Sequence, residues 1–364
     1  MEAPDFSTIL SLADFERVAA ERMDRPAFGY IAGGAGDEIS LRDNRAAFAR
    51  WRMIPRVLND VSAVDTALTL LGTRARMPVG LAPMAFHHFA HPDAELASVR
   101  GAARAGALFC LSTMSSRSME EVAAAADAVA GGPRWFQLYV HRDRQRSVEL
   151  VRRATAAGYS ALIVTVDLPV AGKRERDVRN AFAYPQVFGN FPPPGAVPGG
   201  AEAPLAAVVG GFNDAALTWR DLDWLRGVSD MPLVVKGVLA GADAALAVEH
   251  GAAGVIVSNH GGRQLDRTPA PIDVLAEVVD AVAGRAEVYL DGGVRRGVDV
   301  LTALALGARA VFVGRPMLYA LAVGGEAGVR HAFDLLATEL ATDMALLGAS
   351  TPEKVGREHV RRQG

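Results

Sequence analysis

Residues 287–314, EVYLDGGVRRGVDVLTALALGARAVFVG, contain two short apolar runs on either side of a helical pattern. The runs, Glu287–Asp291 and Ala310–Gly314, are continuous rather than alternating, which is typical of strands buried on both faces. Between them, the pattern Val298–Leu306 is followed by Gly307, and glycine commonly terminates helices. The segment therefore predicts a strand, a helix and a second, parallel strand.

The same alternation runs through most of the chain. Six further apolar runs predict strands at Val79–Pro83, Ala107–Ser112, Arg134–Val140, Ala161–Asp167, Leu233–Gly237 and Gly254–Asn259. Helices are predicted at Ala94–Ala105, Met119–Ala128, Arg144–Ala156, Trp219–Val228, Ala242–His250, Ile272–Val282 and, as the eighth, near Glu326–Leu347. Eight strands, each followed by a helix, predict an α/β protein with a closed (β/α)8 TIM barrel. An open doubly wound sheet is the alternative, but no GxGxxG motif follows the first strand.

Two segments fall outside this repeat. Residues 1–75 contain helical patterns at Leu12–Glu21 and Leu41–Ala49, which predict an N-terminal helical extension that caps the barrel bottom and contributes to the site. The stretch Ala181–Leu217, after the fourth strand, is long, irregular and rich in proline and glycine. Long loops inside compact domains often act as lids, so we expect a lid there and a single domain over residues 1–364.

The composition excludes several classes of protein. The formal net charge of −3 does not indicate a positively charged surface that would bind nucleic acid or membrane lipids. A single cysteine, Cys110, excludes an intramolecular disulfide and a cysteine-based metal cluster and fits a reducing compartment. Met1–Ser11 does not predict a signal peptide, and no apolar run is long enough to span a bilayer. We therefore expect a cytoplasmic protein with no membrane or nucleic-acid partner.

Polar residues gather at the predicted carboxyl ends of the strands, where barrel enzymes carry their chemistry. These residues are Gln137, Tyr139, Thr165, Asp167, Lys236, Ser258, His260, Arg263, Asp291, Arg295 and Arg315. Burying so many polar groups is costly unless a ligand pairs with them. Gly293, Arg295, Gly314 and Arg315 follow the last two strands, the usual phosphate site of barrels. The alternative is that these are only tight turns with solvated arginines.

His260 is the candidate base. It lies three residues before Arg263, and a base beside an arginine suits a substrate whose carboxylate adjoins the carbon that loses a proton. Asp167 would orient the imidazole and stabilise its protonated form. A structural histidine is the simpler alternative. A serine hydrolase is disfavoured because the chain has no serine on a G-x-S-x-G nucleophile elbow.

Two other features leave alternatives open. Lys236, inside an apolar run at a strand end, could form a Schiff base or stabilise negative charge on a cofactor ring. His87, His88 and His91 resemble a metal cluster, but no matching carboxylate pattern accompanies them. We therefore interpret the histidines as part of a loop that lines a pocket, and expect no metal.

Four motifs resemble one family, the FMN-dependent L-2-hydroxy acid oxidases and dehydrogenases, which include glycolate oxidase, lactate oxidase and mandelate dehydrogenase. The motifs are SNHGGRQLD at 258–266, LDGGVRRG at 290–297, YIAGGAGDE at 30–38 and FQLY at 136–139. The resemblance extends from about residue 10 to about residue 350. It implies an enzyme that uses FMN to oxidise an L-2-hydroxy acid to the 2-oxo acid, and a homotetramer.

The resemblance also implies roles for individual residues. His260 would be the base, with Asp167 as its partner. Arg174, Arg263 and Tyr30 would hold the substrate carboxylate, and Tyr139 would contact its hydroxyl. Lys236 would stabilise the reduced flavin, which favours its cofactor role over a Schiff base. The remaining cofactor contacts would come from Ala82, Pro83, Ala85, Ser112, Gln137, Thr165 and Ser258 at the ring, Asp291 at the ribityl chain, and Gly293, Arg295, Gly314 and Arg315 at the phosphate.

Departures from the family pattern bear on the substrate and the electron acceptor. Glycolate oxidases of the family carry tryptophan at the position of Met114 and a bulkier residue near Ala171, which indicates either a roomier pocket or one refilled by Phe86, Met84 or lid residues. We expect a larger apolar or aromatic, mandelate-like acid as the substrate. Ala85 favours O2 as acceptor, giving H2O2. Transfer to a quinone or a protein acceptor is the first alternative, and a Schiff-base aldolase using Lys236 is a more distant one. A non-enzymatic binding barrel would not need a base beside a carboxylate clamp.

Overall fold

The computed structural model describes residues 6–129, 131–184, 188–191 and 211–363. Eight parallel strands form a closed barrel in the order β10-β11-β4-β5-β6-β7-β8-β9. The strands are β4 (Val79–Met84), β5 (Leu108–Ser112), β6 (Arg134–Leu138), β7 (Leu162–Thr165), β8 (Leu233–Val238), β9 (Gly254–Val257), β10 (Glu287–Asp291) and β11 (Ala310–Val313). Each strand falls within its predicted run or extends one residue beyond it, so the predicted TIM barrel is confirmed.

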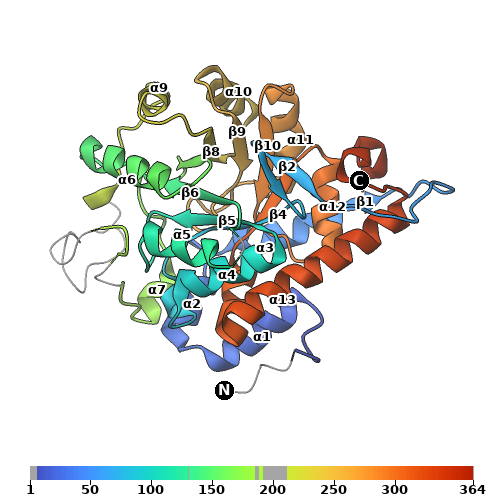
Figure 1. The fold of residues 1–364 in the computed structure, drawn as a ribbon, viewed down its shortest axis with the longest axis horizontal. Coiled ribbons are helices and arrows are strands. Elements are labelled where there is room, and N and C mark those ends of the chain that lie inside the picture. Colours follow the sequence, from blue (N-terminus) through green and yellow to red (C-terminus); the bar gives the residue numbers. More distant parts are fainter. Residues whose placement is uncertain (1–5, 130, 185–187, 192–210, 364) are drawn as a thin grey trace.

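Helices surround the barrel (Figure 1). They are α4 (Ala94–Ala105), α5 (Met119–Asp127), α6 (Arg144–Ala156), α9 (Arg220–Arg226), α10 (Gly241–Glu249), α11 (Pro271–Val282), α12 (Gly297–Ala305) and α13 (Arg315–Leu347). The predicted helix near Glu326–Leu347 is the second part of α13, and the first part, which begins at Arg315, was not predicted. The backbone is non-helical at Gly324 and Gly325, which interrupts the sequence pattern, and Pro316 is tolerated because it lies in the first turn.

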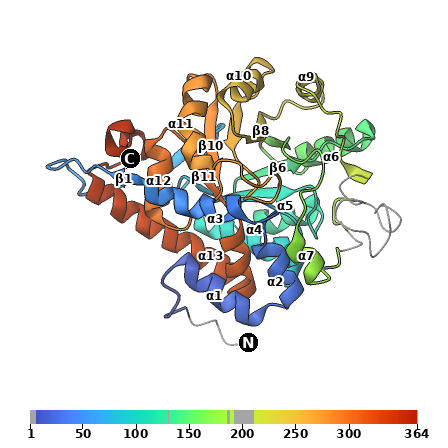
Figure 2. The same ribbon diagram turned by 180° about the vertical axis from the view of Figure 1, so that it is seen from behind.

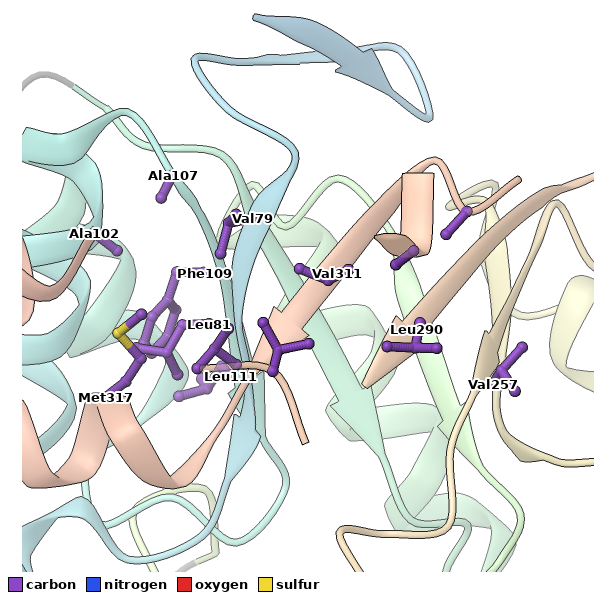
Figure 3. Close-up of a cluster of buried hydrophobic side chains, with 14 of the residues drawn as sticks. Val79, Leu81, Ala102, Ala107, Phe109, Leu111, Val257, Leu290, Val311 and Met317 are labelled. Atoms are coloured by element: carbon purple, nitrogen blue, oxygen red, sulfur yellow. The ribbon is translucent and has the colours of Figure 1, made fainter. Parts of the chain in front are cut away.

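Apolar side chains on the outer face of the strands pack against these helices. Figure 3 shows Leu81 of β4 and Phe109 and Leu111 of β5 gathered around Met317 of α13, with Ala102 of α4 alongside. All five are buried. This packing fixes α13, and with it Arg315 at its first position, against the strands that line the barrel mouth.

A separate apolar cluster fills the inside of the barrel. Trp135, Tyr289 and Phe312 are fully buried there, and their rings contact one another. A hairpin formed by β2 (Leu68–Leu70) and β3 (Thr73–Ala75) adds Leu68 and Leu70 to this cluster. The main-chain N–H of Leu71 bonds Glu287 at the start of β10, which places the hairpin at the bottom of the barrel. The expected cap is therefore this hairpin rather than a helix.

The N-terminal helices lie elsewhere. They are α1 (Leu12–Arg22), α2 (Arg25–Ala32) and α3 (Ile39–Ala46), the last followed by a 3-10 turn at Ala47–Arg50. α1 packs against α13, and α2 lies beside α7 (Glu175–Arg179), as Figure 2 shows. The sequence patterns predicted α1 and α3 but missed α2, since Pro26 and Gly29 interrupt its helical pattern. The extension thus reaches both ends of the barrel.

Short elements complete the described chain. β1 (Trp51–Met53) pairs antiparallel with β12 (Val360–Arg362), and 3-10 turns occur at His87–Phe89, Pro352–Lys354 and Arg357–His359. Much of the expected lid, at 185–187 and 192–210, lies outside the described residues, so the lid stays a prediction. Within the described part of the chain, no helix has the length and apolar character to cross a membrane.

Candidate active site

A cavity opens at the carboxyl ends of the strands and contains about 1110 Å³ of atom-free space, counting its mouth. Fifteen predicted site residues line it: Tyr30, Ala82, Pro83, Ala85, Met114, Tyr139, Arg174, Lys236, His260, Arg263, Asp291, Gly293, Arg295, Gly314 and Arg315. The other predicted residues, Ser112, Gln137, Thr165, Asp167 and Ser258, do not line the cavity but contact one another or residues that do.

His260 and Asp167 form the central pair of the site. Nδ1 of His260 lies 2.8 Å from Oδ1 of Asp167, although the residues come from the loops after β9 and β7. His260 has a left-handed backbone with φ of 57°, and its N–H donates to Oγ of Ser258. This conformation turns the imidazole into the cavity and leaves Nε2 for a ligand.

The surroundings adjust the acidity of both partners. Burial lowers the pKa of His260, and the positive charges of Lys236 and Arg174 act in the same direction, while Asp167 opposes them. Burial alone would raise the pKa of Asp167, but the charges of His260 and Lys236 outweigh it and hold that pKa below its usual value. The imidazole is therefore neutral near pH 7 beside an ionised carboxylate, as a general base requires.

Lys236 is a buried cation with two polar partners. Its Nζ lies 3.2 Å from Oδ2 of Asp291 and donates to Oγ of Ser258 at 3.1 Å. Burial would lower the pKa of Lys236, but Asp291 and Asp167 outweigh it, so the amine stays protonated. A Schiff-base lysine must be neutral to attack a carbonyl, so this environment favours the charge-stabilising alternative.

A chain of hydrogen bonds lies beneath the cavity between β5, β6 and β7. Oε1 of Gln137 accepts from Oγ of Ser112 and from the N–H of Thr113, both at 3.2 Å. Its Nε2 donates to Oγ1 of Thr165 at 3.0 Å. The structure therefore brings these three predicted cofactor contacts into one polar row.

Arg174 and Arg263 line the cavity next to Tyr30. Arg263 donates from Nη1 to the carbonyls of Tyr30 and Gly33 and lies over the Tyr30 ring at 4.9 Å. Arg174 is 8% exposed, and its Nε bonds the carbonyl of Arg263. Within the described residues, the hydrogen bonds of both arginines go to main-chain carbonyls, so these cations have no carboxylate bonded to them. A ligand with a carboxylate would supply one.

The loops after β10 and β11 form the other end of the cavity. Gly293 has φ of 87°, and a Cβ there would lie 1.9 Å from the carbonyl oxygen of Asn44. Nε of Arg295 is buried with no partner among the described residues. Arg315 donates to the carbonyls of Ile31, Gly33 and Gly261. Burial, with Arg263 nearby, lowers the pKa of Arg315 to about 9, so an anion would stabilise its charge.

The remaining wall of the cavity is apolar and aromatic. Met114, Phe86 and Leu168 line it together with Tyr184. Oη of Tyr184 donates to Asp177 at 2.9 Å, and its ring meets that of Tyr30 edge-on. Burial raises the pKa of Tyr139, which therefore keeps its proton and can donate a hydrogen bond into the cavity.

Sequence reasoning missed several residues of the site. The ring of Phe182 stacks on Tyr30 at 4.4 Å, and Tyr184 reaches the cavity from the same loop, which the sequence marked only as irregular. Asn44, on α3, pairs with Asn259 across 215 positions of sequence. No local pattern in the sequence could have indicated that pair.

The histidine motif does not assemble a metal site. His87 and His88 bond Oγ of Ser98 and Ser116 at 2.8 Å, and Nδ1 of His91 accepts from the N–H of Asp93. No group of three potential ligands occurs in the described part of the chain. Phe86, immediately before the motif, lines the cavity.

The sequence model of the FMN-dependent dehydrogenase family matches residues 19–362. The chain belongs to the FMN-dependent dehydrogenase family. This membership confirms two expectations from the motifs: FMN is the cofactor, and the protein is an oxidoreductase of the 2-hydroxy acid class.

Relatives in the family are similar over nearly their whole length. An L-lactate oxidase from Nostoc sp. is 49% identical, over 94% of this chain and 96% of the relative. Glycolate oxidase 3 of Arabidopsis thaliana is 46% identical, over 97% and 96%. Two crystal structures of mandelate oxidase, with (S)-2-phenylpropionate and with benzoyl-formic acid, each have a TM-score of 0.86, at 43% and 44% identity, and cover 97% of this chain and 98% of theirs.

The cavity fits the cofactor of the family. Oδ1 of Asp291 and Nε of Arg295, both residues of the cavity wall, are buried without partners among the described residues, and such atoms are rare unless a ligand or water satisfies them. Lys236 supplies a fixed positive charge in the wall, and Arg295 and Arg315 supply charge at the glycine-lined end. The residues thus suit a ligand with a polar ring at one end and a phosphate at the other.

Proposed function

We propose that this protein oxidises an L-2-hydroxy acid to the 2-oxo acid with O2 as the electron acceptor. The substrate loses two electrons and two protons, and O2 gains them to give H2O2. One observation carries the proposal: the His260–Asp167 pair faces the same cavity as the buried Arg174 and the half-buried Arg263, which have no carboxylate bonded to them among the described residues. A hydroxy acid has the carboxylate and the adjoining acidic proton that this arrangement would hold and remove.

The arginines orient the substrate. Arg263, fixed by the carbonyls of Tyr30 and Gly33, and the buried Arg174 would clamp the carboxylate. Tyr30 would add a hydrogen bond, and the protonated Tyr139 would contact the hydroxyl group. Holding the acid in this way places its carbon and hydroxyl group toward His260, which converts a bimolecular encounter into an oriented one.

His260 removes the proton at Nε2. Asp167, bonded at Nδ1, fixes the tautomer and stabilises the imidazolium that forms. FMN bound in this cavity would supply the two-electron redox chemistry that links the hydroxy acid to O2. Ser112, Gln137, Thr165, Ser258 and Lys236 would hold its ring, Asp291 its ribityl chain, and Gly293, Arg295, Gly314 and Arg315 its phosphate, with Ala82, Pro83 and Ala85 on the β4 side.

The apolar wall supports a larger substrate. Met114 offers an adaptable side chain where family glycolate oxidases have tryptophan, and Phe86 and Tyr184 present aromatic faces to the cavity. We therefore propose an aromatic, mandelate-like acid. The similarity to mandelate oxidases supports this choice, whereas the lactate and glycolate oxidases make small acids the competitors.

The acceptor is proposed on two supports. Ala85, which lines the cavity directly after β4, is the residue that oxidases of the family tend to carry there. The similar proteins from Nostoc sp. and Arabidopsis thaliana are an L-lactate oxidase and a glycolate oxidase. Transfer to a quinone or a protein acceptor is the alternative, and the rate of flavin reoxidation in air distinguishes it from transfer to O2.

The absorption spectrum of the purified holoenzyme tests this function. Anaerobic addition of L-mandelate should bleach the yellow flavin, and D-mandelate, the mirror-image control, should not. Readmitted air should restore the colour with one H2O2 per turnover. Bleaching by glycolate or L-lactate far faster than by mandelate would overturn the aromatic substrate, and slow reoxidation in air would overturn O2 as acceptor.

We also propose, from the family resemblance, that the chain acts in the cytoplasm as a homotetramer and as one domain, with a lid at 181–217. Light scattering of the purified holoenzyme would test the assembly. A mass of one or two chains would contradict it.

A further inference from the structure

Two buried amides join the N-terminal extension to the catalytic loop. Nδ2 of Asn44 donates to Oδ1 of Asn259 at 2.8 Å, and Nδ2 of Asn259 donates to Oδ1 of Asn44 at 2.7 Å. Asn44 is on α3 and is 2% exposed; Asn259 directly precedes His260 and is 5% exposed. The pair is therefore a reciprocal contact, shielded from water, between distant parts of the chain.

The neighbours of Asn259 fix the orientation of its amide. The N–H of Gly262 donates to Oδ1 at 3.1 Å, and the carbonyl of Pro269 accepts from Nδ2 at 3.2 Å. If the amide of Asn259 were reversed, its NH2 group would face the N–H of Gly262, and its oxygen would face the carbonyl of Pro269. Asn44 therefore has to present a donor and an acceptor at the same time, which an ionised aspartate cannot do because it only accepts, and a serine hydroxyl offers a single oxygen in place of the two amide atoms.

Asn259 in turn closes the turn that carries the base. The N–H of Gly262 also donates to the main-chain carbonyl of Asn259. The side chain and the main chain of Asn259 therefore both stabilise the turn. Within this turn His260 has φ of 57°, in the left-handed region that few residues other than glycine adopt, although histidine, asparagine and aspartate adopt it more often than most. Such a backbone persists only where its surroundings over-determine it.

The main chain of Asn44 lies against the loop after β10. Its carbonyl oxygen is so close to Gly293 that a Cβ at that position would lie 1.9 Å away. Its Nδ2 would be 3.3 Å from a Cβ on Gly292. One residue thus touches both the loop of the base and the loop proposed to hold the FMN phosphate.

We propose that Asn44 is a positioning residue that sets the His260 turn and the Gly292–Gly293 loop relative to each other. This inference rests on the proposed function and deepens it, since it makes FMN retention and the placement of the base depend on one residue of the N-terminal extension, through its main chain beside Gly293 and its side chain bonded to Asn259. Asn44 does not line the cavity and acts only through Asn259 and Gly293.

Asn44→Asp is the most informative variant because it keeps the shape of the side chain. Its carboxylate would lose the donor to Asn259 and place negative charge beside the phosphate loop. We expect FMN to dissociate about tenfold more readily and anaerobic reduction by L-mandelate to slow about tenfold, the effect of one lost buried hydrogen bond. The ratio of variant to wild-type rate should rise as pH falls, since protonation restores a donor.

Ser40→Ala provides the matched control. Ser40 is fully buried on the same helix, and its Oγ donates to the carbonyl of Thr268 in the same long loop. It should lower the melting temperature but leave FMN release, followed by flavin fluorescence, and the reduction rate unchanged. Asn44→Ser, a neutral variant, should weaken FMN and slow reduction without the new pH dependence, and replaces Asn44→Asp if that protein does not fold.

The outcomes separate the two proposals. If Asn44→Asp and Asn44→Ser lose only stability, as Ser40→Ala does, Asn44 is structural and the inference is wrong. If no 2-hydroxy acid reduces the wild-type holoenzyme, the proposed function fails. FMN release from the variants then still decides whether Asn44 sets the phosphate loop.

Discussion

Arg263 and Arg315 donate hydrogen bonds to one shared acceptor, the main-chain carbonyl of Gly33, at 2.8 Å each. Gly33 follows the last residue of α2, and Arg263 and Arg315 also bond the carbonyls of Tyr30 and Ile31, respectively. The carboxyl end of a helix carries partial negative charge, which suits cations. A helix of the N-terminal extension therefore fixes the arginine proposed for the substrate and the arginine proposed for the phosphate in one cluster.

This cluster makes Arg263→Lys a test of the carboxylate clamp. Lysine keeps the charge, but it cannot bond the two carbonyls and a carboxylate in one plane. We expect the KM for the hydroxy acid to rise about 10- to 100-fold, because bidentate binding is lost, while FMN stays bound. Steady-state kinetics with an FMN count per chain measure both. An unchanged KM would contradict the assignment of Arg263.

Replacement of the proposed base, His260, should slow the reduction of the flavin and leave cofactor binding intact. His260→Asn keeps a polar side chain next to Asp167 and removes the proton acceptor. Reduction of the flavin by the hydroxy acid should slow about 10²- to 10⁴-fold, the usual contribution of a general base. Anaerobic stopped-flow absorbance measures the rate. A yellow variant that is reduced at the wild-type rate would rule out His260 as the base.

The pH dependence of reduction should follow His260. Burial lowers the pKa of His260, and the base must be neutral, so the rate should rise with pH through a value below 6.5 and then stay level. In Asp167→Asn the carboxylate that opposes this lowering is gone. The rising limb should then move to lower pH while the plateau falls. A limb that moves to higher pH would contradict the proposed electrostatics.

Met114 should influence the choice of substrate. It is 7% exposed, lines the cavity, and its carbonyl accepts from the N–H of Phe86. Met114→Trp fills space beside the aromatic wall, so the ratio of kcat/KM for L-mandelate to that for glycolate should fall about tenfold or more, as steric exclusion from a packed pocket costs about 1–3 kcal/mol. Met114→Leu, similar in volume, is the control. An unchanged ratio with Trp would place the substrate side chain elsewhere.

Gly293→Ala should destabilise the fold and release FMN. The new Cβ would lie 1.9 Å from the carbonyl oxygen of Asn44, in a backbone with φ of 87°. Gly284→Ala is the matched control, because Gly284 has φ of 72° and nothing lies within 4 Å of a Cβ there. Strain alone costs roughly 1 kcal/mol, and the clash should add roughly 1–3 kcal/mol. Thermal unfolding of the two variants measures the difference, and equal melting temperatures would contradict it.

Sequence patterns predicted the barrel well because each strand and helix is a local feature. The polar strand ends were predicted to share one site because parallel strands of a barrel end on the same face, and the cavity brings Lys236, His260 and Arg295 together as expected. α2 was missed because a proline and a glycine interrupt its pattern. The first part of α13, from Arg315 to the non-helical Gly324 and Gly325, was also missed, whereas the part after this break was predicted.

The sequence by itself determined the eight alternating strands and helices, the glycines Gly293 and Gly314 after the last two strands, and the set of polar groups at the barrel mouth. Only the tertiary structure decided how those groups pair. Asp167 lies 93 positions from His260, and Ile31 lies 284 positions from Arg315. Partners so distant in sequence are brought together by closure of the barrel and by the docking of α2 and α3 on its mouth. Because the buried site has low polarity, each polar contact formed there is strong and each one left unmade is costly.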